Sequence, residues 1–276
     1  MTKLFLAASA AALALAATPD LASAQDWSGG YIGLYGGYGQ TNDQDDERLR
    51  FDRNLDGNFG DTVTTPAGAD AFSPGSCGGA ANTGVAADGC DEDFDSVEAG
   101  VRAGWDFQFG SFVIGAVAEY SGVSAEDSVT SYSTTPASYT FERKLENLAA
   151  VRGRIGYAMG PALIYGTAGG ATGEMSNQFY SSNGLNSFDA TVKDDQAEGY
   201  QAGGGIEYRL AGNLSLTGEY IYTSLEAPDF NIRVGRGIAA ANNPFVLTPN
   251  TTGTDITRSN GRFGLHALRI GMNYRF

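Results

Sequence analysis

Residues 96–109 read SVEAGVRAGWDFQF, and their side chains alternate between apolar and either polar or glycine at every position. Because successive side chains of a β-strand point to opposite faces, this period of two predicts a strand with one apolar and one polar face. A half-buried strand of a soluble sandwich averages about 5 to 6 residues, whereas a tilted strand needs about 9 to 11 to cross a bilayer. The length of this segment therefore favours a membrane strand.

The same alternation returns in later parts of the chain. It covers residues 150–157, 201–210, 215–220 and 268–276, and none of these apolar faces carries a charged side chain. An arginine or lysine on a lipid face costs roughly 2 to 4 kcal/mol at the middle of a membrane, so uncharged faces are what a bilayer selects. The sequence therefore predicts an all-β fold, an eight-stranded antiparallel transmembrane β-barrel. Its strands are expected near residues 29–40, 95–109, 112–124, 144–158, 162–174, 196–210, 214–226 and 263–276.

Short and long connections alternate between these strands. The short ones are residues 110–111, 159–161 and 211–213, and the long ones are residues 41–94, 125–143, 175–195 and 227–262. Bacterial outer-membrane barrels have short periplasmic turns and long extracellular loops. We therefore expect both ends of the barrel domain on the periplasmic side. The strands near 29–40 and 162–174 are rich in glycine, and their alternation does not assign an outward face.

Residues 1–24 have the three parts of a secretory signal peptide. Lys3 supplies a positive charge, Leu4 to Ala17 form an apolar run, and Ala22-Ser23-Ala24 gives the pattern of small residues that signal peptidase reads. The alternative is a permanent N-terminal helix, but a spanning helix needs roughly 20 apolar residues. Cleavage before Gln25 would leave residues 25–276 as the barrel domain.

In the strands whose alternation is clearest, the inward-facing positions carry equal numbers of acidic and basic side chains. The acids are Glu98, Asp106, Glu119, Glu146, Glu207 and Glu219, and the bases are Arg102, Arg152, Arg154, Arg209, Arg269 and Arg275. An eight-stranded barrel is just wide enough for side chains to fill it, and buried charges must be paired or hydrated. This pattern predicts a salt-bridged plug that contains water. The alternative is a charged path for ions.

The net charge of −15 argues against nucleic acid as a partner, since nucleic-acid binding needs a basic face. Much of this charge lies in residues 41–92, which hold eleven acids and three bases. Within them Asp52, Asn54 and Asp56 followed by Gly57 match the opening of a calcium loop. Position twelve of that loop is Val63 instead of the usual glutamate, and a solvated acidic loop is the alternative. Calcium is a candidate ligand here, and divalent ions could also bridge acidic loops to lipopolysaccharide phosphates.

Cys77 and Cys90 are the only cysteines, and in an exported chain they predict one disulfide. The alternative, metal ligation together with the only histidine, His266, would need ligands that the spacing does not supply. His266 lies on the apolar parity of the last strand, where the sequence assigns it no catalytic partner. We therefore expect no enzymatic activity and no cofactor.

Three motifs resemble those of a known group of proteins. They are Trp27 to Gly33 (WSGGYIG), Val151 to Tyr157 (VRGRIGY) and Arg269 to Phe276 (RIGMNYRF). The chain resembles the porin-family small outer-membrane barrels of the opacity-protein and surface-antigen group, which are OmpA-like. The resemblance implies an outer-membrane location among lipid and lipopolysaccharide. It also implies that the terminal Phe276 is a signal for the barrel-assembly machinery.

The functional prediction is a non-enzymatic integral outer-membrane surface protein. Its barrel would contribute to the envelope, and its long loops would make surface interactions with a partner that the sequence does not identify. The alternative is a small porin-like diffusion channel, and a third possibility is a barrel enzyme that acts on lipid or peptide.

Overall fold

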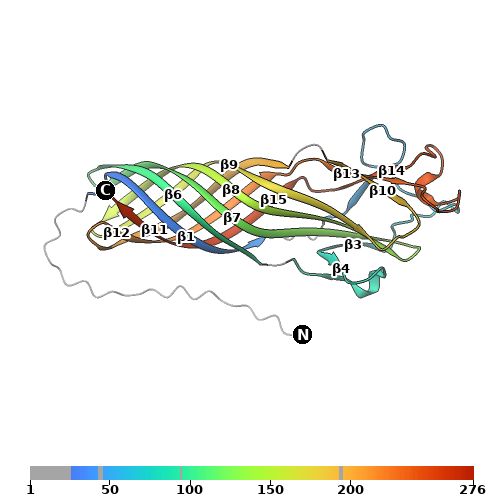
Figure 1. Ribbon diagram of the computed structural model, residues 1–276, viewed down its shortest axis with the longest axis horizontal. Coiled ribbons are helices and arrows are strands. Elements are labelled where there is room, and N and C mark those ends of the chain that lie inside the picture. The colour runs from blue at the N-terminus through green and yellow to red at the C-terminus, as the bar shows by residue number, and fades with distance from the viewer. Residues whose placement is uncertain (1–25, 43–45, 94, 193–194) are drawn as a thin grey trace.

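The computed structural model describes residues 26–42, 46–93, 95–192 and 195–276. Eight strands wind around an elongated barrel, and the longer connections fold together beyond one of its ends (Figure 1). The C-terminus lies at the other end, beside the short turns. The signal peptide predicted for residues 1–24 lies outside the described residues.

Eight strands pair in a closed antiparallel ring. They are β1 (Gly29–Thr41), β6 (Ser96–Phe109), β7 (Phe112–Ser133), β8 (Ala137–Met159), β9 (Ala162–Ser181), β11 (Gln196–Ala211), β12 (Leu214–Glu226) and β15 (Arg262–Arg275). Each pairs with its neighbour along the chain, and the pairing of β1 with β15 joins the first strand to the last. The predicted fold class is confirmed, and the described residues contain seven further, shorter strands outside the ring.

The outer surface of the ring is an apolar belt. Its exposed side chains include Ile32, Leu34, Val101, Trp105, Phe107, Ile114, Val151, Ile155, Ile164, Ile206, Leu268, Ile270 and Met272. A belt of this kind faces lipid in outer-membrane barrels. The structure also assigns the faces of the two glycine-rich strands. In β1 the ring of Tyr35 is buried while Leu34 is exposed, and in β9 Leu163 is buried while Ile164 is exposed.

The prediction of a long loop at residues 125–143 is wrong. β7 and β8 continue through this segment and are joined by residues 134–136 alone, and β9 also runs on to Ser181. Beyond Tyr120 the outward positions of β7 become Gly122, Ser124 and Glu126. The apolar alternation therefore stops where the lipid face stops, although the strand does not.

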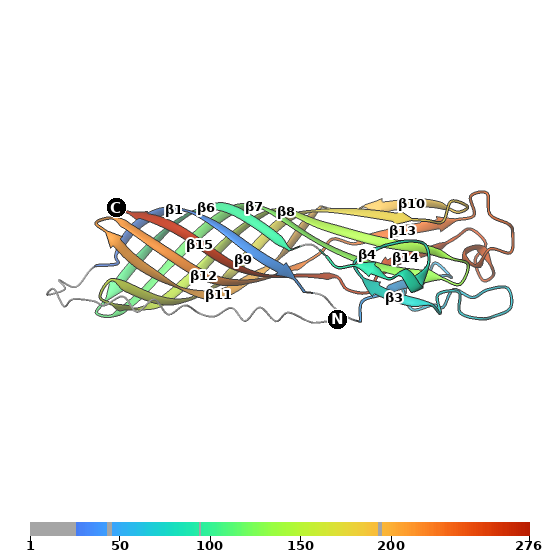
Figure 2. The ribbon, with the colours of Figure 1, turned by 90° about the horizontal axis from the view of Figure 1, so that it is seen from below.

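The remaining connections form a second layer against these strand extensions (Figure 2). β2 (Leu49–Asp52), β10 (Ser187–Val192), β13 (Phe230–Gly235) and β14 (Thr254–Arg258) make a sheet in the order β10-β13-β14-β2. β3 (Gly75–Gly78) pairs with the extension of β7, and β4 (Ala80–Ala81) pairs with β5 (Cys90–Asp91). We call this whole region, including the extensions of β7 to β9, the cap.

The cap has an apolar core of its own. The buried members of this core are Leu49, Phe51, Val63, Ala71, Val129, Ala137, Tyr139, Phe141, Phe230, Ile232, Val234, Phe245 and Ile256. They come from the strand extensions, from the four-stranded sheet and from the loops between them. Two 3-10 turns, η1 (Ala86–Asp88) and η2 (Pro244–Val246), are the helical elements of the described residues. No helix in this part of the chain is long and apolar enough to span a membrane.

Candidate functional site

Ten charged side chains lie buried inside the barrel and face one another across it. They are Glu98, Asp106, Glu119, Glu207 and Glu219 with Arg102, Arg152, Arg154, Arg269 and Arg275. The strand alternation placed all ten on the inward face. Five carboxylates meet five guanidinium groups, so this ion-pair network carries no net charge.

Glu119 and Glu219 are the centres of one half of the network. Glu119 lies 2.8 Å from a terminal nitrogen of Arg152 and 3.0 Å from one of Arg269. Glu219 lies 2.6 Å from Arg102 and accepts a hydrogen bond of 2.7 Å from the Tyr165 hydroxyl. Each carboxylate therefore has a basic partner and at least one further polar contact.

Asp106 and Glu207 organise the other half, nearer the short turns. Arg154 lies 3.2 Å from Asp106 and 2.9 Å from Glu207, so it bridges the two acids. Arg275 approaches Asp106 to 2.8 Å. The Ser215 hydroxyl donates a hydrogen bond of 2.6 Å to Glu207. Buried charges are costly unless they are paired, and each of these has at least one ion-pair partner.

Two residues expected inside the barrel lie elsewhere. Glu146 is exposed, because the β8–β9 register shifts between Leu145 and Asn147 and inserts it as an extra residue. A bulge of this kind reverses the facing on one side of it, which a strict period of two does not anticipate. Arg209 lies at the mouth beside the short turns, where it makes no ion pair with a described acid. Its guanidinium lies 4.7 Å from the ring centre of Trp27.

Trp27 closes this end of the barrel and was not predicted to do so. Its side chain is fully buried, and the Arg275 guanidinium donates a hydrogen bond of 2.5 Å to its carbonyl oxygen. Trp27 precedes the first strand, so strand alternation carries no information about where its ring points.

An apolar layer fills the barrel on the other side of the ion-pair network. It comprises Val123, Ala125, Leu145, Leu148, Ala150, Ala171, Met175, Ala197, Leu225, Phe263 and Leu265, all buried. We call this layer the apolar plug. Leu225 and Phe263 are direct partners in the β12–β15 pairing and are both fully buried. The plug was not predicted, although its side chains stand at inward positions where the sequence already shows leucine and phenylalanine.

A second buried ion cluster lies beyond the plug, at the base of the cap. Asp127 of β7 lies 2.5 Å from Arg143 of β8 and 3.1 Å from Arg258 of β14. Glu47 lies 2.7 Å from Arg258 on its other side. Burial by itself would raise the pKa of Asp127, but the two guanidinium groups outweigh it and hold that pKa below its usual value. This cluster links the strand extensions to the loop sheet through charge.

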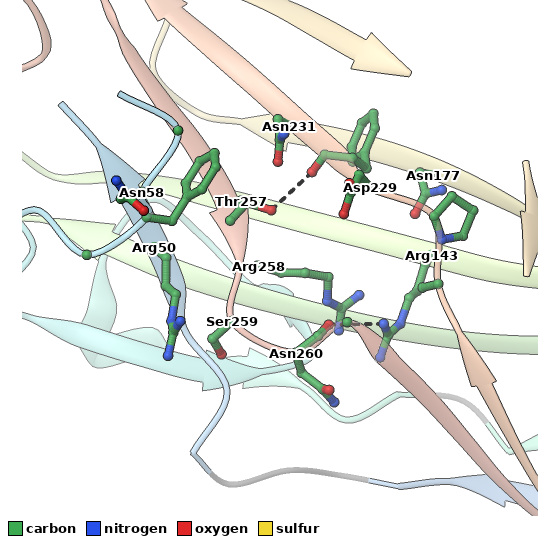
Figure 3. Close-up of a pocket in the computed structure, with 17 residues that line it drawn as sticks. Arg50, Asn58, Arg143, Asn177, Asp229, Asn231, Thr257, Arg258, Ser259 and Asn260 are labelled. Carbon is green, nitrogen blue, oxygen red and sulfur yellow. Dashed lines mark hydrogen bonds between the residues drawn. The ribbon is translucent and has the colours of Figure 1, made fainter. Parts of the chain in front are cut away.

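An open cleft of about 660 Å³ lies over this cluster on the surface of the cap (Figure 3). Arg50 of β2, Asn231 of β13 and Thr257 of β14 line it from the loop sheet. Asn177 of β9 and Asp229, which follows β12, line it from the barrel side. The sequence did not single out any of these residues, because they come from three expected loops that only the fold brings together.

The proposed calcium residues lie in one tight turn. Asp52 is buried, and its carboxylate accepts hydrogen bonds from the backbone amides of Asp56, at 3.2 Å, and Gly57, at 2.7 Å. Asn54 accepts a further bond from the Asp56 amide. Among the described residues there is no group of three or more histidine, cysteine or acidic side chains placed to hold a metal. Calcium would therefore have to compete with amide groups for the Asp52 oxygens.

Calcium binding at this turn stays a prediction of the sequence motif. Isothermal titration of the protein with CaCl₂ would measure it, with Asp56→Asn as the variant and Asp189→Asn, on another cap strand, as the control. A heat signal lost only in Asp56→Asn would support the site. No heat at millimolar calcium would contradict it.

The chain is similar to known outer-membrane proteins. A family model described as the outer membrane protein beta-barrel domain matches residues 5–276. The chain belongs to this family. It is 28% identical over 179 residues to a 31 kDa outer-membrane immunogenic protein of Brucella melitensis, a match that covers 64% of this chain and 65% of the relative. It is also 32% identical over 143 residues to a 22 kDa outer membrane protein of Rhizobium leguminosarum bv. viciae, covering 49% and 56% of the two chains.

The chain thus spans less than two thirds of these curated relatives. Among solved structures, the outer membrane protein OprG of Pseudomonas aeruginosa is 12% identical with a TM-score of 0.43, and the match covers 90% of this chain and 98% of that one. Membership of the beta-barrel domain family confirms the predicted outer-membrane location. The short turns of the barrel therefore face the periplasm, and the cap lies outside the cell.

Two further residues predicted from the sequence, His266 and Phe276, lie at opposite rims of the lipid belt. His266 contacts the Tyr220 hydroxyl at 2.6 Å through Nδ1 and the Asn42 side-chain oxygen at 2.9 Å through Nε2. Neither contact involves a carboxylate that could orient a catalytic base. At the other rim the ring of Phe276 is exposed, and its backbone amide donates to the Gly30 carbonyl at 2.9 Å. The assembly role of Phe276 remains a prediction.

Cys77 and Cys90 are joined by a disulfide, which confirms that prediction. The disulfide joins β3, which pairs with the outer end of β7, to β5, which pairs with β4. The Tyr132 hydroxyl of β7 contacts the Cys90 sulfur at 3.6 Å. Closing a loop of about 15 residues contributes roughly 3 kcal/mol in the chain-entropy model.

Replacing both cysteines by serine is therefore expected to loosen residues 77–90 and leave the barrel folded. Limited proteolysis of the cap would show faster cleavage in this segment. A heat-modifiability gel on the same samples would show an unchanged barrel. Labelling of free thiols in the unmodified mature protein would contradict the disulfide.

Proposed function

We propose that this protein is a non-enzymatic surface protein whose barrel anchors the cap in the outer membrane and whose cap makes contacts outside the cell. The observation that carries the proposal is the filled lumen. The ion-pair network occupies one level of the barrel, and the apolar plug occupies the next. Ions moving along the axis would have to cross a layer of buried apolar side chains, which offers no group to replace their water.

The cap supports a role in surface contacts. Its strand extensions and its loop sheet enclose thirteen buried apolar residues, so its outer side chains are held on rigid elements. Sites built on strands hold their contacting groups more reliably than sites on loose loops. A connection that only linked two membrane strands would not need a core of this size.

Planar-bilayer recording on the purified protein tests the closed lumen. We expect no stable unitary current steps, because an ion would have to pass both the apolar plug and the ion-pair network. A heat-modifiability gel on the same preparation shows that the barrel under test is folded. Stable unitary steps would overturn the proposal and favour the alternative, a small porin-like diffusion channel.

The proposal also holds that the protein catalyses no reaction. Outer-membrane barrels include proteases, and one is among the solved structures that the chain resembles in outline. In support of a non-enzymatic role, His266 contacts a tyrosine and an asparagine. A screen against lipid and peptide substrates, with His266→Ala as the comparison, tests this point. Turnover that His266→Ala abolishes would contradict it.

The proposed partners follow from the location. Lipid and lipopolysaccharide surround the belt, and the barrel-assembly machinery would read the C-terminal strand that ends at Phe276. The exposed apolar ring of Phe276 and the open lipid face of β15 support that reading.

A further inference from the structure

We propose that the cleft of the cap binds an anionic saccharide, a sugar chain that carries a phosphate or a carboxylate group. The proposal rests on the surface role proposed above and gives the cap a ligand class. It is argued from the shape of the cleft, from one free guanidinium group, and from a row of polar side chains on a rigid sheet.

The cleft has the size of a ligand site. Its volume of about 660 Å³ lies within the range of about 300 to 1,000 Å³ that small-molecule sites occupy. It is an open cleft lined by residues of the cap, among them Arg50, Asn231 and Thr257 (Figure 3). A sugar chain could therefore enter it while the protein stays in the outer membrane.

Three polar residues form a row across the loop sheet. Arg50 and Thr257 are direct partners in the β2–β14 pairing. The pairing of Ile232 with Ile256 places Asn231 next in the same row. Residues paired across strands share a face of the sheet, and neighbouring strands lie about 4.8 Å apart.

This row faces the cleft. The alternate residues of the same strands, Phe51, Ile232 and Ile256, are buried in the core of the cap. Arg50, Asn231 and Thr257 therefore point away from that core, and all three line the cleft. Because the backbone on which they stand is fixed by sheet pairing, their spacing exists before a ligand binds.

Arg50 is the cation available to a ligand. The other two arginines of the cleft, Arg143 and Arg258, are held by Asp127. Arg50 is exposed, and no acid of the described residues forms an ion pair with it. A guanidinium group binds phosphate or carboxylate through paired N–H donors. The anionic group of the ligand is therefore assigned to Arg50.

The rest of the lining suits sugar hydroxyl groups better than a bare anion. Asn177 and Asn231 each offer an amide that both donates and accepts, and Asp229 offers an exposed acceptor. The half-buried ring of Phe59 adds an apolar surface. An inorganic anion would use Arg50 alone and would be repelled by Asp229. A sugar with one anionic group binds Arg50 through that group and donates hydrogen bonds to Asp229 from its hydroxyl groups.

Isothermal titration of the detergent-solubilised full chain tests the proposal with four probes. They are the lipid-free phosphorylated core oligosaccharide of lipopolysaccharide, a uronic acid tetramer, neutral maltotetraose and inorganic phosphate. We expect one or both anionic oligosaccharides to bind at least tenfold more tightly than maltotetraose and phosphate. The two anionic probes separate a phosphorylated envelope sugar from a carboxylated polysaccharide.

The matched variants are Arg50→Ala and Asn231→Ala in the cleft, with Arg236→Ala as the control. Arg236 is an exposed arginine of the cap outside the cleft, so it carries the same charge change. We expect Arg50→Ala to weaken binding at least tenfold, Asn231→Ala to weaken it severalfold, and Arg236→Ala to change it less than twofold. Near-ultraviolet circular dichroism of each variant checks that the cap remains folded.

Two results would overturn the proposal. One is equal affinity for maltotetraose and for both anionic oligosaccharides. The other is an equal loss of affinity in Arg50→Ala and Arg236→Ala, which would indicate attraction by overall charge. A failure of the proposed surface role would appear as stable unitary current steps in the planar-bilayer recording. That measurement does not depend on the result of the titration.

Discussion

Replacement of Arg269 by alanine is expected to lower the free energy of unfolding of the barrel by about 3 to 5 kcal/mol, the usual cost of removing one partner of a buried ion pair. Arg269 is fully buried and faces Glu98 at 2.5 Å and Glu119 at 3.0 Å. Its loss leaves Glu98 in the barrel without the guanidinium group it faces. Urea-induced unfolding in lipid vesicles measures the change, with the fluorescence of Trp105 on the lipid face as a reporter.

The control for Arg269→Ala is Arg236→Ala, since Arg236 is exposed and hydrogen-bonds only a carbonyl oxygen of the described chain. Exposed positions of this kind usually change stability by about 0.5 kcal/mol or less. A double variant, Arg269→Met with Glu98→Gln, removes both charges and is expected to recover part of the loss. Equal unfolding free energies for Arg269→Ala and Arg236→Ala would show that the network does not stabilise the barrel.

Replacement of Asp127 by alanine is expected to open the cap without opening the barrel. Asp127 is the acid that holds both Arg143 and Arg258. Among the described residues, its removal leaves these two nearly buried guanidinium groups with Glu47 as their one ion-pair partner. The local free energy of opening should fall by about 3 to 5 kcal/mol. Hydrogen exchange of the β13 and β14 amides would measure this loss, while the amides of β1 and β6 keep their protection.

The preceding residue of β7 supplies the matched control. Glu126 pairs with Lys144 at 2.9 Å, but about a third of each of these two side chains is exposed. Exposed pairs contribute about 0 to 1 kcal/mol. Glu126→Ala should therefore leave the exchange of β13 and β14 nearly unchanged. If Glu126→Ala and Asp127→Ala raised exchange equally, the buried cluster would have no special role in closing the cap.

The cap should also respond to acid, but only below the usual range of aspartate. The pKa of Asp127 is lowered from 3.8, so its charge stabilises the folded cap above that pH and this stabilisation is lost as the pH falls further through the lowered value. Hydrogen exchange of the cap should thus be the same at pH 7 and pH 5 once the intrinsic rates are corrected. Opening between pH 7 and pH 5 would contradict the assignment to Asp127.

The strands of the barrel could be predicted because the membrane acts on each of them separately. Lipid demands an apolar side chain at every second position, so the 96–109 segment shows its two faces without reference to any other part of the chain. The same rule ends at the edge of the lipid. Beyond Tyr120 it gives no signal, so the sequence predicts a loop where the structure has the extensions of β7 and β8.

The exceptions inside the barrel have local causes that alternation does not contain. Glu146 leaves the lumen because one extra residue at a bulge reverses its facing. Trp27 enters the lumen from outside the strand pattern and is covered by Arg209 and Arg275. In both cases the position of the side chain depends on contacts with other segments of the chain. The alternation within a single strand does not show such contacts.

The sequence by itself determined the alternating faces, the short turns, ten of the inward charges and the cysteine pair. Each of these follows from a local rule of strand geometry or export chemistry. Only the tertiary structure decided that the charges pair with one another, that an apolar plug closes the lumen, and that three loops meet around a cleft. These features depend on contacts between segments far apart in the chain, such as Arg50 with Thr257. Such contacts are set by packing in the folded chain. The sequence around each residue does not show which distant residue it will contact.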